Sequence, residues 1–286
     1  MQSKQTLRDA YLKQINKVVE YINNNLDNEL TLSKLAEISC FSPFHFHRIM
    51  KAFLGESLGA YISRIRIETA AGLLRYTKLP IEEIAYSIGF EMPSSLSKAF
   101  KQHYGISASA YRNHKNSQTM KTPLIHEELS LKAPKMVALE SKTVIYIQIT
   151  GEYGNANYGD TWNRLWGFVK AHSLFTAGME SIGLSHDDPN ITDSEKCRYD
   201  ACLVIHKPVQ PEGEVGVKEL AGGKFAVFQY QGSYANLSIV YDTIFGKWLP
   251  ESGFELRNAP CFEKYLNNPN RTEPAKLKTE IYLPVL

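Results

Sequence analysis

One pattern of about 25 residues occurs twice in the first 105 residues of the sequence, and it constrains the fold more than any other feature. Its first copy is TLSKLAEISCFSPFHFHRIMKAFLG, which runs from Thr31 to Gly55. Thr31 is a suitable N-cap for a short helix that ends near Cys40, and Ser42 followed by Pro43 suits the start of a second helix. Apolar residues then recur at helical spacing in both parts. The pattern therefore predicts two short helices joined by a tight turn.

The second copy is IEEIAYSIGFEMPSSLSKAFKQHYG, from Ile81 to Gly105, and it aligns with the first at an offset of 49 before the turn and 50 after it. Gly89 in its turn suits a left-handed backbone. An apolar stripe between the copies predicts a helix of about 20 residues, roughly 30 Å long. That length is close to the ~34 Å that separates successive major-groove faces of B-DNA. We call each two-helix pattern a reading head and the helix between them the spacer. Two reading heads on one spacer are therefore expected to enter adjacent grooves of duplex DNA.

The two blocks LSKLAEISCFSPFHFHRIMKAFLGESLGAYI and PIEEIAYSIGFEMPSSLSKAFKQHYGISASAYR resemble the AraC/XylS family of transcription regulators. The resemblance covers residues Leu7 to Arg112. It implies an all-α domain with two helix-turn-helix motifs, and it implies which side chains face the bases. These base-facing positions are Phe44, His47, Arg48, Ser94, Ser97 and Lys98.

Chemistry divides the expected DNA contacts into two kinds. Arg48 suits bidentate contact with the O6 and N7 atoms of guanine, so it is the strongest candidate for base readout. Lys51 and Lys101 are expected to contact phosphates, which position a protein on DNA but carry little sequence information. The second head, with Pro93 and two serines, offers weaker base discrimination than the first.

Charge differs between the two parts of the sequence. Up to Gln118 there are 15 Lys and Arg against 10 Asp and Glu, a net charge of +5, whereas the remainder has 17 against 20, a net charge of −3. Phosphate binding favours the basic first part, and an acidic second part would be repelled by DNA. The two parts are therefore expected to have different partners.

Several classes of function find no support in the sequence. No apolar run approaches the ~20 residues of a membrane span, and the N-terminus has no signal-peptide core. The four cysteines show no paired spacing, which fits a reducing cytoplasm. His45 and His47 point to different sides of a helix, so they do not suggest a metal site. We expect a cytoplasmic protein without metal or cofactor.

From Pro134 onward the pattern changes to strands, and this region is internally doubled. The expected strands share alternating or continuous apolar character and cover residues 136–140, 143–150, 199–206, 224–230, 261–266 and 279–285. Gly151 matches Gly232 at an offset of 81, and Gly183 matches Glu263 at an offset of 80. Each half is then strand, helix, strand, strand. Two such halves predict one curved sheet with both helices on one face and the other face uncovered.

Alternation along the strands indicates which side chains point to that uncovered face. If isoleucines of the strand 143–150 lie under the helices, then Tyr146 points away from them. The same reasoning assigns Glu263 and Tyr265 to the open face if Phe262 is inward, and it assigns Glu280 and Tyr282 there as well. A carboxylate among tyrosines suits a flat cation through charge and cation–π attraction. The alternative is that Glu263 and Glu280 are solvated strand residues.

The motifs FEKYLNNP and LKTEIYLPV make the second half similar to GyrI-like effector-binding domains, over residues Leu129 to Leu286. The resemblance implies a module that binds hydrophobic, often cationic, small molecules, with Glu263 as the leading ligand carboxylate. The expected ligand-binding residues are Tyr146, Glu263, Tyr265, Glu280 and Tyr282.

The fold class expected from these patterns is an all-α double helix-turn-helix domain followed by an α+β domain of two strand-helix-strand-strand repeats. The expected boundaries are 1–117 for the DNA-binding domain, 118–128 for a polar linker and 129–286 for the small-molecule domain. The function expected is a DNA-binding transcription regulator that senses a small molecule, rather than an enzyme. Two alternatives are a second domain that hydrolyses a reactive small molecule, and one that contacts a protein such as RNA polymerase.

Overall fold

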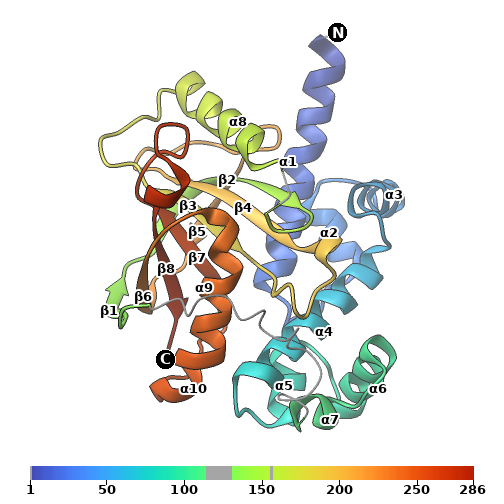
Figure 1. Ribbon diagram of the computed structural model, residues 1–286. Coiled ribbons are helices and arrows are strands. Elements are labelled where there is room, and N and C mark those ends of the chain that lie inside the picture. The colour runs from blue at the N-terminus through green and yellow to red at the C-terminus, as the bar shows by residue number, and fades with distance from the viewer. Residues whose placement is uncertain (1, 114–130, 155–156) are drawn as a thin grey trace. The chain divides into compact units, whose positions relative to one another are not determined.

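A computed structural model describes residues 2–113, 131–154 and 157–286 (Figure 1). The chain divides into two compact units, one built from helices and one built around a sheet. The expected linker, 118–128, lies outside the described residues.

The helical unit contains seven helices in chain order. They are α1 (Gln2–Asn24), α2 (Leu32–Ile38), α3 (Pro43–Leu54), α4 (Leu58–Tyr76), α5 (Ile81–Ser87), α6 (Pro93–Tyr104) and α7 (Ala108–Asn113). The pairs α2–α3 and α5–α6 are the two copies of the repeated pattern. This confirms the double helix-turn-helix architecture.

These helices begin and end at the capping residues that the sequence predicts. The Thr31 side chain accepts a hydrogen bond from the Lys34 amide, and the Ser42 side chain accepts one from the His45 amide, so both caps satisfy donors that a helix start leaves open. Gly55 and Gly105 end α3 and α6 in the left-handed conformation. The two longer helices of the motifs therefore begin at a proline and end at a glycine in the same way.

The spacer helix α4 is buried on most of its sides, including charged positions. Arg64 is 9% exposed and Glu68 is 8% exposed. The Arg64 guanidinium forms ion pairs with Glu56 at 2.8 Å and with Glu68 at 3.0 Å, which compensates the charge that burial would otherwise leave unpaired. Arg66 donates to the carbonyl oxygens of Leu26 and Asn28, in the segment between α1 and α2.

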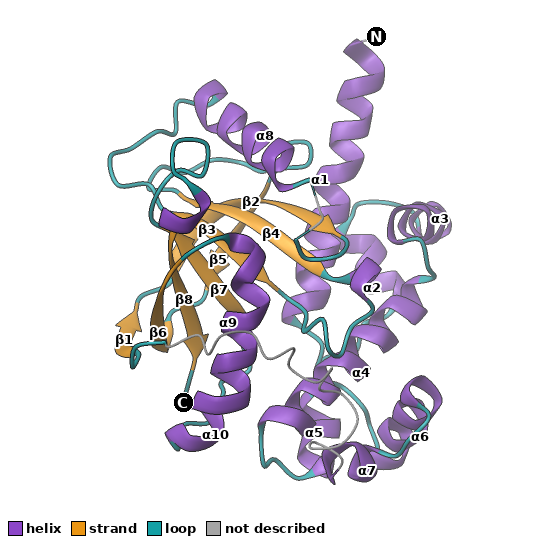
Figure 2. Ribbon diagram, viewed as in Figure 1, coloured by secondary structure: helices purple, strands orange, loops and turns teal. Residues whose placement is uncertain are grey.

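The second unit holds eight strands and two main helical segments (Figure 2). The strands are β1 (Lys135–Leu139), β2 (Lys142–Thr150), β3 (Ser181–Ser185), β4 (Arg198–Val204), β5 (Gly216–Leu220), β6 (Gly223–Gln231), β7 (Cys261–Tyr265) and β8 (Lys278–Pro284). The helices are α8 (Tyr158–Ala171), α9 (Leu237–Thr243) and α10 (Leu249–Ser252), with a π-helical turn, Ile244–Trp248, between the last two.

All eight strands form one sheet in the order β1-β6-β8-β7-β3-β4-β2-β5. The units β2-α8-β3-β4 and β6-α9-β7-β8 repeat the same order of elements, which confirms the doubled strand-helix-strand-strand architecture. The two copies meet where β3 pairs antiparallel with β7, in a register that places Gly183 opposite Glu263. Short strands β3 and β5 were not among the expected segments.

Helices from both copies lie on one face of the sheet, as expected. Tyr158 of α8 packs on Tyr199 of β4, and Tyr241 of α9 bonds to Glu263 of β7. The register places these sheet residues on the same face, because Gly183 is opposite both Ala201 and Glu263. We call this the helix face.

The expectation of an uncovered second face is wrong. Side chains on that face form a buried cluster to which all eight strands contribute; it includes Val144, Tyr146, Leu184, Val227, Phe262 and Tyr282. Phe262 is 2% exposed there and stacks on Tyr282 at a centroid distance of 4.4 Å. The sheet is strongly twisted (Figure 2), so its second face buries its own side chains.

In the helical unit, Gly89 lies in the turn of the second motif, close to the contact between Arg66 and Leu26. A Cβ atom added there would lie 2.3 Å from the Leu26 carbonyl oxygen and 2.5 Å from Nη2 of Arg66, whereas one added at Gly55 would have nothing within 4 Å. Both glycines have positive φ, +81° and +73°, so both alanine variants share a backbone cost of roughly 1–2 kcal/mol. Overpacking should cost Gly89→Ala about 1–3 kcal/mol more than Gly55→Ala. Urea unfolding, monitored by the circular dichroism signal of the helices, measures the loss of unfolding free energy in both variants. Equal losses would contradict the close approach of Gly89 to Leu26 and Arg66.

Candidate functional site

Helix α3 presents the residues expected to read DNA on its exposed side. His47, Arg48 and Lys51 are exposed, whereas Phe46 and Met50, on the opposite side, are completely buried. The side chain of Phe44 lies outside the described part of the structure. Because α3 contains no acidic residue, its exposed side can approach phosphates without repulsion.

Helix α6 shows the same division. Ser94, Ser97, Lys98 and Lys101 are exposed, and Leu96 and Phe100 are buried. The helix contains no acidic residue and starts at Pro93, with no side-chain cap bond from Met92. The fold therefore presents all seven described candidates on exposed helix surface.

The second candidate site is centred on Glu263, on the helix face of the sheet. Glu263 is 5% exposed, and its two carboxylate oxygens accept hydrogen bonds from two tyrosine hydroxyls. Tyr241 Oη donates to Oε1 at 3.0 Å, and Tyr265 Oη donates to Oε2 at 2.5 Å. Tyr199 Oη lies 3.1 Å from Tyr265 Oη, which extends the chain of hydroxyls. We call these four residues, with the aromatic rings that surround them, the Glu263 cluster.

Aromatic rings from both helical segments complete the cluster. Trp162 and Tyr158 of α8 pack edge-on against Tyr265 and Tyr199, at centroid distances of 5.9 and 4.8 Å. Tyr234, just after β6, has its ring 5.2 Å from that of Tyr265. Each ring can offer its negative face to a cation.

Gly183 makes this arrangement possible. A Cβ atom at that position would lie 2.3 Å from Tyr265 Oη and 2.5 Å from Tyr199 Oη. Only glycine leaves room for two tyrosine hydroxyls over the strand. The sequence comparison of the two halves had already singled out Gly183 as the counterpart of Glu263.

The charge of Glu263 has no cationic partner among the described residues. Burial raises the pKa of Glu263, and the hydrogen bonds from Tyr265 and Tyr241 lower it only in part. Burial, together with the charge of Glu263, raises the pKa of Tyr199, Tyr241 and Tyr265 well above the usual range. The tyrosines therefore remain protonated donors at neutral pH.

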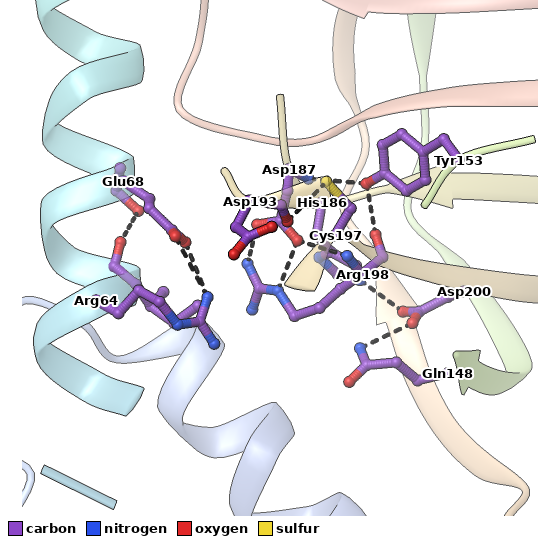
Figure 3. A network of polar contacts seen from close by, with 12 residues as sticks. Arg64, Glu68, Gln148, Tyr153, His186, Asp187, Asp193, Cys197, Arg198 and Asp200 are labelled. Atoms are coloured by element: carbon purple, nitrogen blue, oxygen red, sulfur yellow. Dashed lines mark hydrogen bonds and ion pairs between the residues drawn. The ribbon is translucent and has the colours of Figure 1, made fainter. Parts of the chain in front are cut away.

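Asp200, another buried carboxylate of the same unit, shows what a structural acid looks like here (Figure 3). Asp200 is 0% exposed, pairs with His186 at 2.7 Å and with Lys218, and accepts a hydrogen bond from Gln148 at 2.8 Å. Burial alone would raise the pKa of Asp200, but the charges of His186 and Lys218 hold it below the usual range. Glu263 has no comparable cationic partner among the described residues.

The structure separates the five expected ligand residues. Glu263 and Tyr265 lie together in the cluster, but Tyr146 and Tyr282 are 4% and 7% exposed in the core of the opposite face. Glu280 is on that face too and accepts a hydrogen bond from Tyr282 Oη at 2.8 Å. The expectation that all five share one face is wrong, because Phe262 packs on the second face and thereby reverses the alternation of β7.

Sequence reasoning missed most of the aromatic partners. Tyr199, Tyr241, Tyr234 and Trp162 were not among the candidates. The repeat contained a signal for Tyr199. An offset of 80 makes Tyr199 the counterpart of Thr279, and Thr279 is opposite Tyr265 in the β7–β8 register, which indicates the same face for Tyr199 as for Tyr265. Tyr241 had no comparable signal.

Other kinds of site receive no support from the part of the chain that is described. No group of three His, Cys, Asp or Glu residues there could hold a metal ion, and no helix there is long and apolar enough to cross a membrane. The four cysteines, all of which lie in the described part of the chain, form no disulfide.

Comparison with known proteins assigns both units. Residues 132–286 match the family model described as GyrI-like small molecule binding domain, and residues 35–114 match a helix-turn-helix domain. The Right origin-binding protein of Escherichia coli K12 is 24% identical over 282 residues, which cover 93% of this chain and 95% of that protein. The HTH-type transcriptional activator AarP of Providencia stuartii is 38% identical over 98 residues, 34% of this chain and 73% of that protein. The probable transcriptional regulator YgiV of Escherichia coli K12 is 33% identical over 108 residues, 37% of this chain and 67% of that protein.

The raised pKa of Glu263 predicts a pH-dependent effect of Glu263→Gln on stability. A raised carboxyl pKa means that the folded state binds the proton more tightly than the unfolded state, so wild-type stability is highest below the unfolded pKa and falls as pH rises through the folded pKa. The Glu263→Gln variant has no carboxyl proton to release at this position, so its stability does not decrease in this way as pH rises. Its unfolding free energy should therefore equal that of wild type at low pH and exceed it at neutral pH.

Urea unfolding across a pH series measures this difference. Glu273→Gln is a matched control, because the Glu273 side chain is 72% exposed. A Glu263→Gln variant that is less stable than wild type at neutral pH would mean that the carboxylate contributes to folding.

Proposed function

Because this chain belongs to the family of GyrI-like small molecule binding domains and carries an AraC-type helix-turn-helix domain, it is a DNA-binding transcription regulator with a small-molecule-binding domain, and we propose that Glu263 receives a hydrophobic cation. One observation carries the proposal. Glu263 is a buried carboxylate with aromatic neighbours and, among the described residues, no positive charge to balance it.

Physical chemistry favours a cation over a neutral ligand at this position. Burial without a counter-ion destabilises the ionised carboxylate, and a bound cation would recover that free energy. Aromatic rings around the carboxylate add cation–π attraction of about 0.5–2 kcal/mol for each well-placed contact. A neutral molecule of the same shape would gain only the apolar burial.

For DNA, we propose that α3 and α6 enter successive major grooves. Arg48, with His47 and Phe44, would read bases in the first groove; Ser94, Ser97 and Lys98 would face bases in the second, and Lys51 and Lys101 would contact phosphates. The exposure of all seven described side chains supports the proposal. Helix α4, with 19 residues and a length of about 28 Å, is the spacer.

The proposal includes RNA polymerase as a third partner and the cytoplasm as the location, because a regulator acts where DNA is transcribed. Co-purification of polymerase with the DNA-bound protein tests the first point. A complex that forms only without DNA and without ligand would favour a protein-interaction module instead.

Hydrolysis of a reactive ligand is the second candidate function for the sheet unit. The 2.5 Å hydrogen bond from Tyr265 to Glu263 is an acid–base pair within reach of one bound molecule. Prolonged incubation with a candidate ligand, followed by mass spectrometry, separates the two functions. Unchanged ligand supports a sensor, and consumption that Glu263→Gln abolishes supports an enzyme.

The Glu263 proposal predicts a charge-selective loss of binding. Glu263→Gln keeps the shape and removes the charge, so methyltriphenylphosphonium should bind at least tenfold more weakly, since a hydrogen-bonded or paired charge contributes about 1.5–3 kcal/mol. Triphenylphosphine oxide, which is neutral and similar in shape, should lose little. Calorimetric titration of both compounds into both proteins decides the matter, and equal losses would indicate a structural role for Glu263.

The DNA proposal predicts two different kinds of loss. Arg48→Ala should relax the preference at one position of the selected site, at a cost of roughly 1–3 kcal/mol. Lys101→Ala should weaken binding to all sequences alike and lower the slope of log affinity against log salt by about 1. Selection from a random duplex library, followed by titration at several salt concentrations, measures both. If the sequence selected by Arg48→Ala is unchanged, Arg48 does not read a base.

A further inference from the structure

The duplicated module contains the same tyrosine position in both copies, so the surroundings of the two tyrosines can be compared. Gly151 and Gly232 are equivalent, and the amide of each donates to an equivalent carbonyl, Cys197 O and Leu277 O, at 2.9 Å in both cases. Tyr153 and Tyr234 are therefore also equivalent. Any difference between these two tyrosines reflects a difference in role rather than in fold.

In the first copy the tyrosine hydroxyl is fully used by the fold (Figure 3). Tyr153 Oη donates to the carbonyl oxygen of Arg198 at 2.7 Å and accepts from the Asp187 amide at 3.2 Å. Asp187 in turn forms an ion pair with the Arg198 guanidinium at 2.6 Å. Tyr153 thus ties the segment after β2 to the start of β4.

In the second copy the fold does not use the hydroxyl. Asn267, the counterpart of Asp187, bonds to Lys276 O at 3.0 Å and to the Lys278 amide at 2.9 Å through its own side chain. The Tyr234 ring packs on Tyr265 instead, and its hydroxyl is buried with no hydrogen-bond partner in the described part of the chain. Tyr234 belongs to the Glu263 cluster rather than to the framework.

A second hydroxyl of the same kind lies on the neighbouring strand, beside Tyr265. Thr279 is opposite Tyr265 in the β7–β8 register and is 1% exposed, yet its Oγ1 also lacks a partner among the described residues. Its counterpart in the first copy is Tyr199, whose hydroxyl is bonded to Tyr265 Oη. Two unbonded hydroxyls therefore flank the tyrosine that donates to Glu263.

Burying a hydroxyl without a hydrogen bond opposes folding, and native proteins contain few such groups. Here two of them gather beside one site, and the other copy of the module has a bonded hydroxyl at each matching position. A ligand that hydrogen-bonds to them would recover the cost on binding. The hydroxyls are therefore better explained by recognition than by folding.

We propose that Tyr234 and Thr279 are specificity-determining residues that hydrogen-bond to the effector. The effector class is then an aromatic or hydrophobic cation that also carries a hydroxyl, carbonyl or N–H group, and a cation with a pure hydrocarbon body binds less well. The inference rests on the proposed cation site at Glu263 and adds a polar requirement to it.

Matched phosphonium cations test this requirement on the full-length protein. One series carries 2-hydroxyethyl, 3-hydroxypropyl or 4-hydroxybutyl on triphenylphosphonium, and the other carries propyl, butyl or pentyl, so that each pair differs by a hydroxyl in place of a methyl group. Calorimetry should show that at least one hydroxyl compound binds wild type about three- to tenfold more tightly than its partner. Tyr234→Phe and Thr279→Val should each reduce that ratio, because each removes a hydroxyl that only the hydroxyl compounds can use.

Thermal unfolding of the same variants separates recognition from structure. Tyr234→Phe and Thr279→Val remove unbonded hydroxyls, so they should unfold at or above the wild-type temperature, whereas Tyr153→Phe breaks two hydrogen bonds and should unfold at a lower one. Ratios near one for every pair in wild type, or ratios that the two variants leave unchanged, would overturn the inference while the cation site stands. If no phosphonium binds wild type, the Glu263 proposal itself fails.

Discussion

The organisation of the sheet unit depends on one electrostatic constraint, which is that Glu263 keeps a carboxylate under two helical segments without a compensating positive charge. Asp200 shows that the same sheet can bury an acid safely, because His186 and Lys218 neutralise it. At Glu263 only neutral tyrosine hydroxyls approach the oxygens. Among the described residues, the fold therefore retains a buried negative charge without a cationic partner at Glu263, and our proposal is that a cationic ligand balances this charge.

The helical unit was predictable nearly to the residue, because its signals are local. Thr31 and Ser42 cap their helices as expected, and Gly55 and Gly105 end α3 and α6. The exposed positions of α3 and α6 follow from the burial of Phe46, Met50, Leu96 and Phe100, which share one helical period. A motif that is specified by its own caps and periodicity leaves little for tertiary contacts to decide.

The sheet unit was predictable in architecture but not in the face of each strand. The internal repeat gave the order of elements and the equivalence of Gly183 with Glu263. Alternation then failed because both faces are buried, so an apolar residue such as Phe262 no longer indicates which side the helices cover. Tyr241, from a helix distant in sequence, could join Glu263 only through the tertiary fold. Contacts of this kind require coordinates.

The doubled module also has a consequence for how the site can change. The copy β2-α8-β3-β4 carries the hydrogen-bonded Tyr153 and the paired acid Asp200, whereas β6-α9-β7-β8 carries Tyr234 and Glu263, which lack such partners among the described residues. Under our proposal, substitutions at Tyr234, Glu263 and Thr279 would change which effectors bind and would leave the contacts of Tyr153 and Asp200 in place. The same order of elements thus occurs twice in one sheet with different polar partners, and the contacts that tie Tyr153 and Asp200 into the first copy are separate from those around Tyr234.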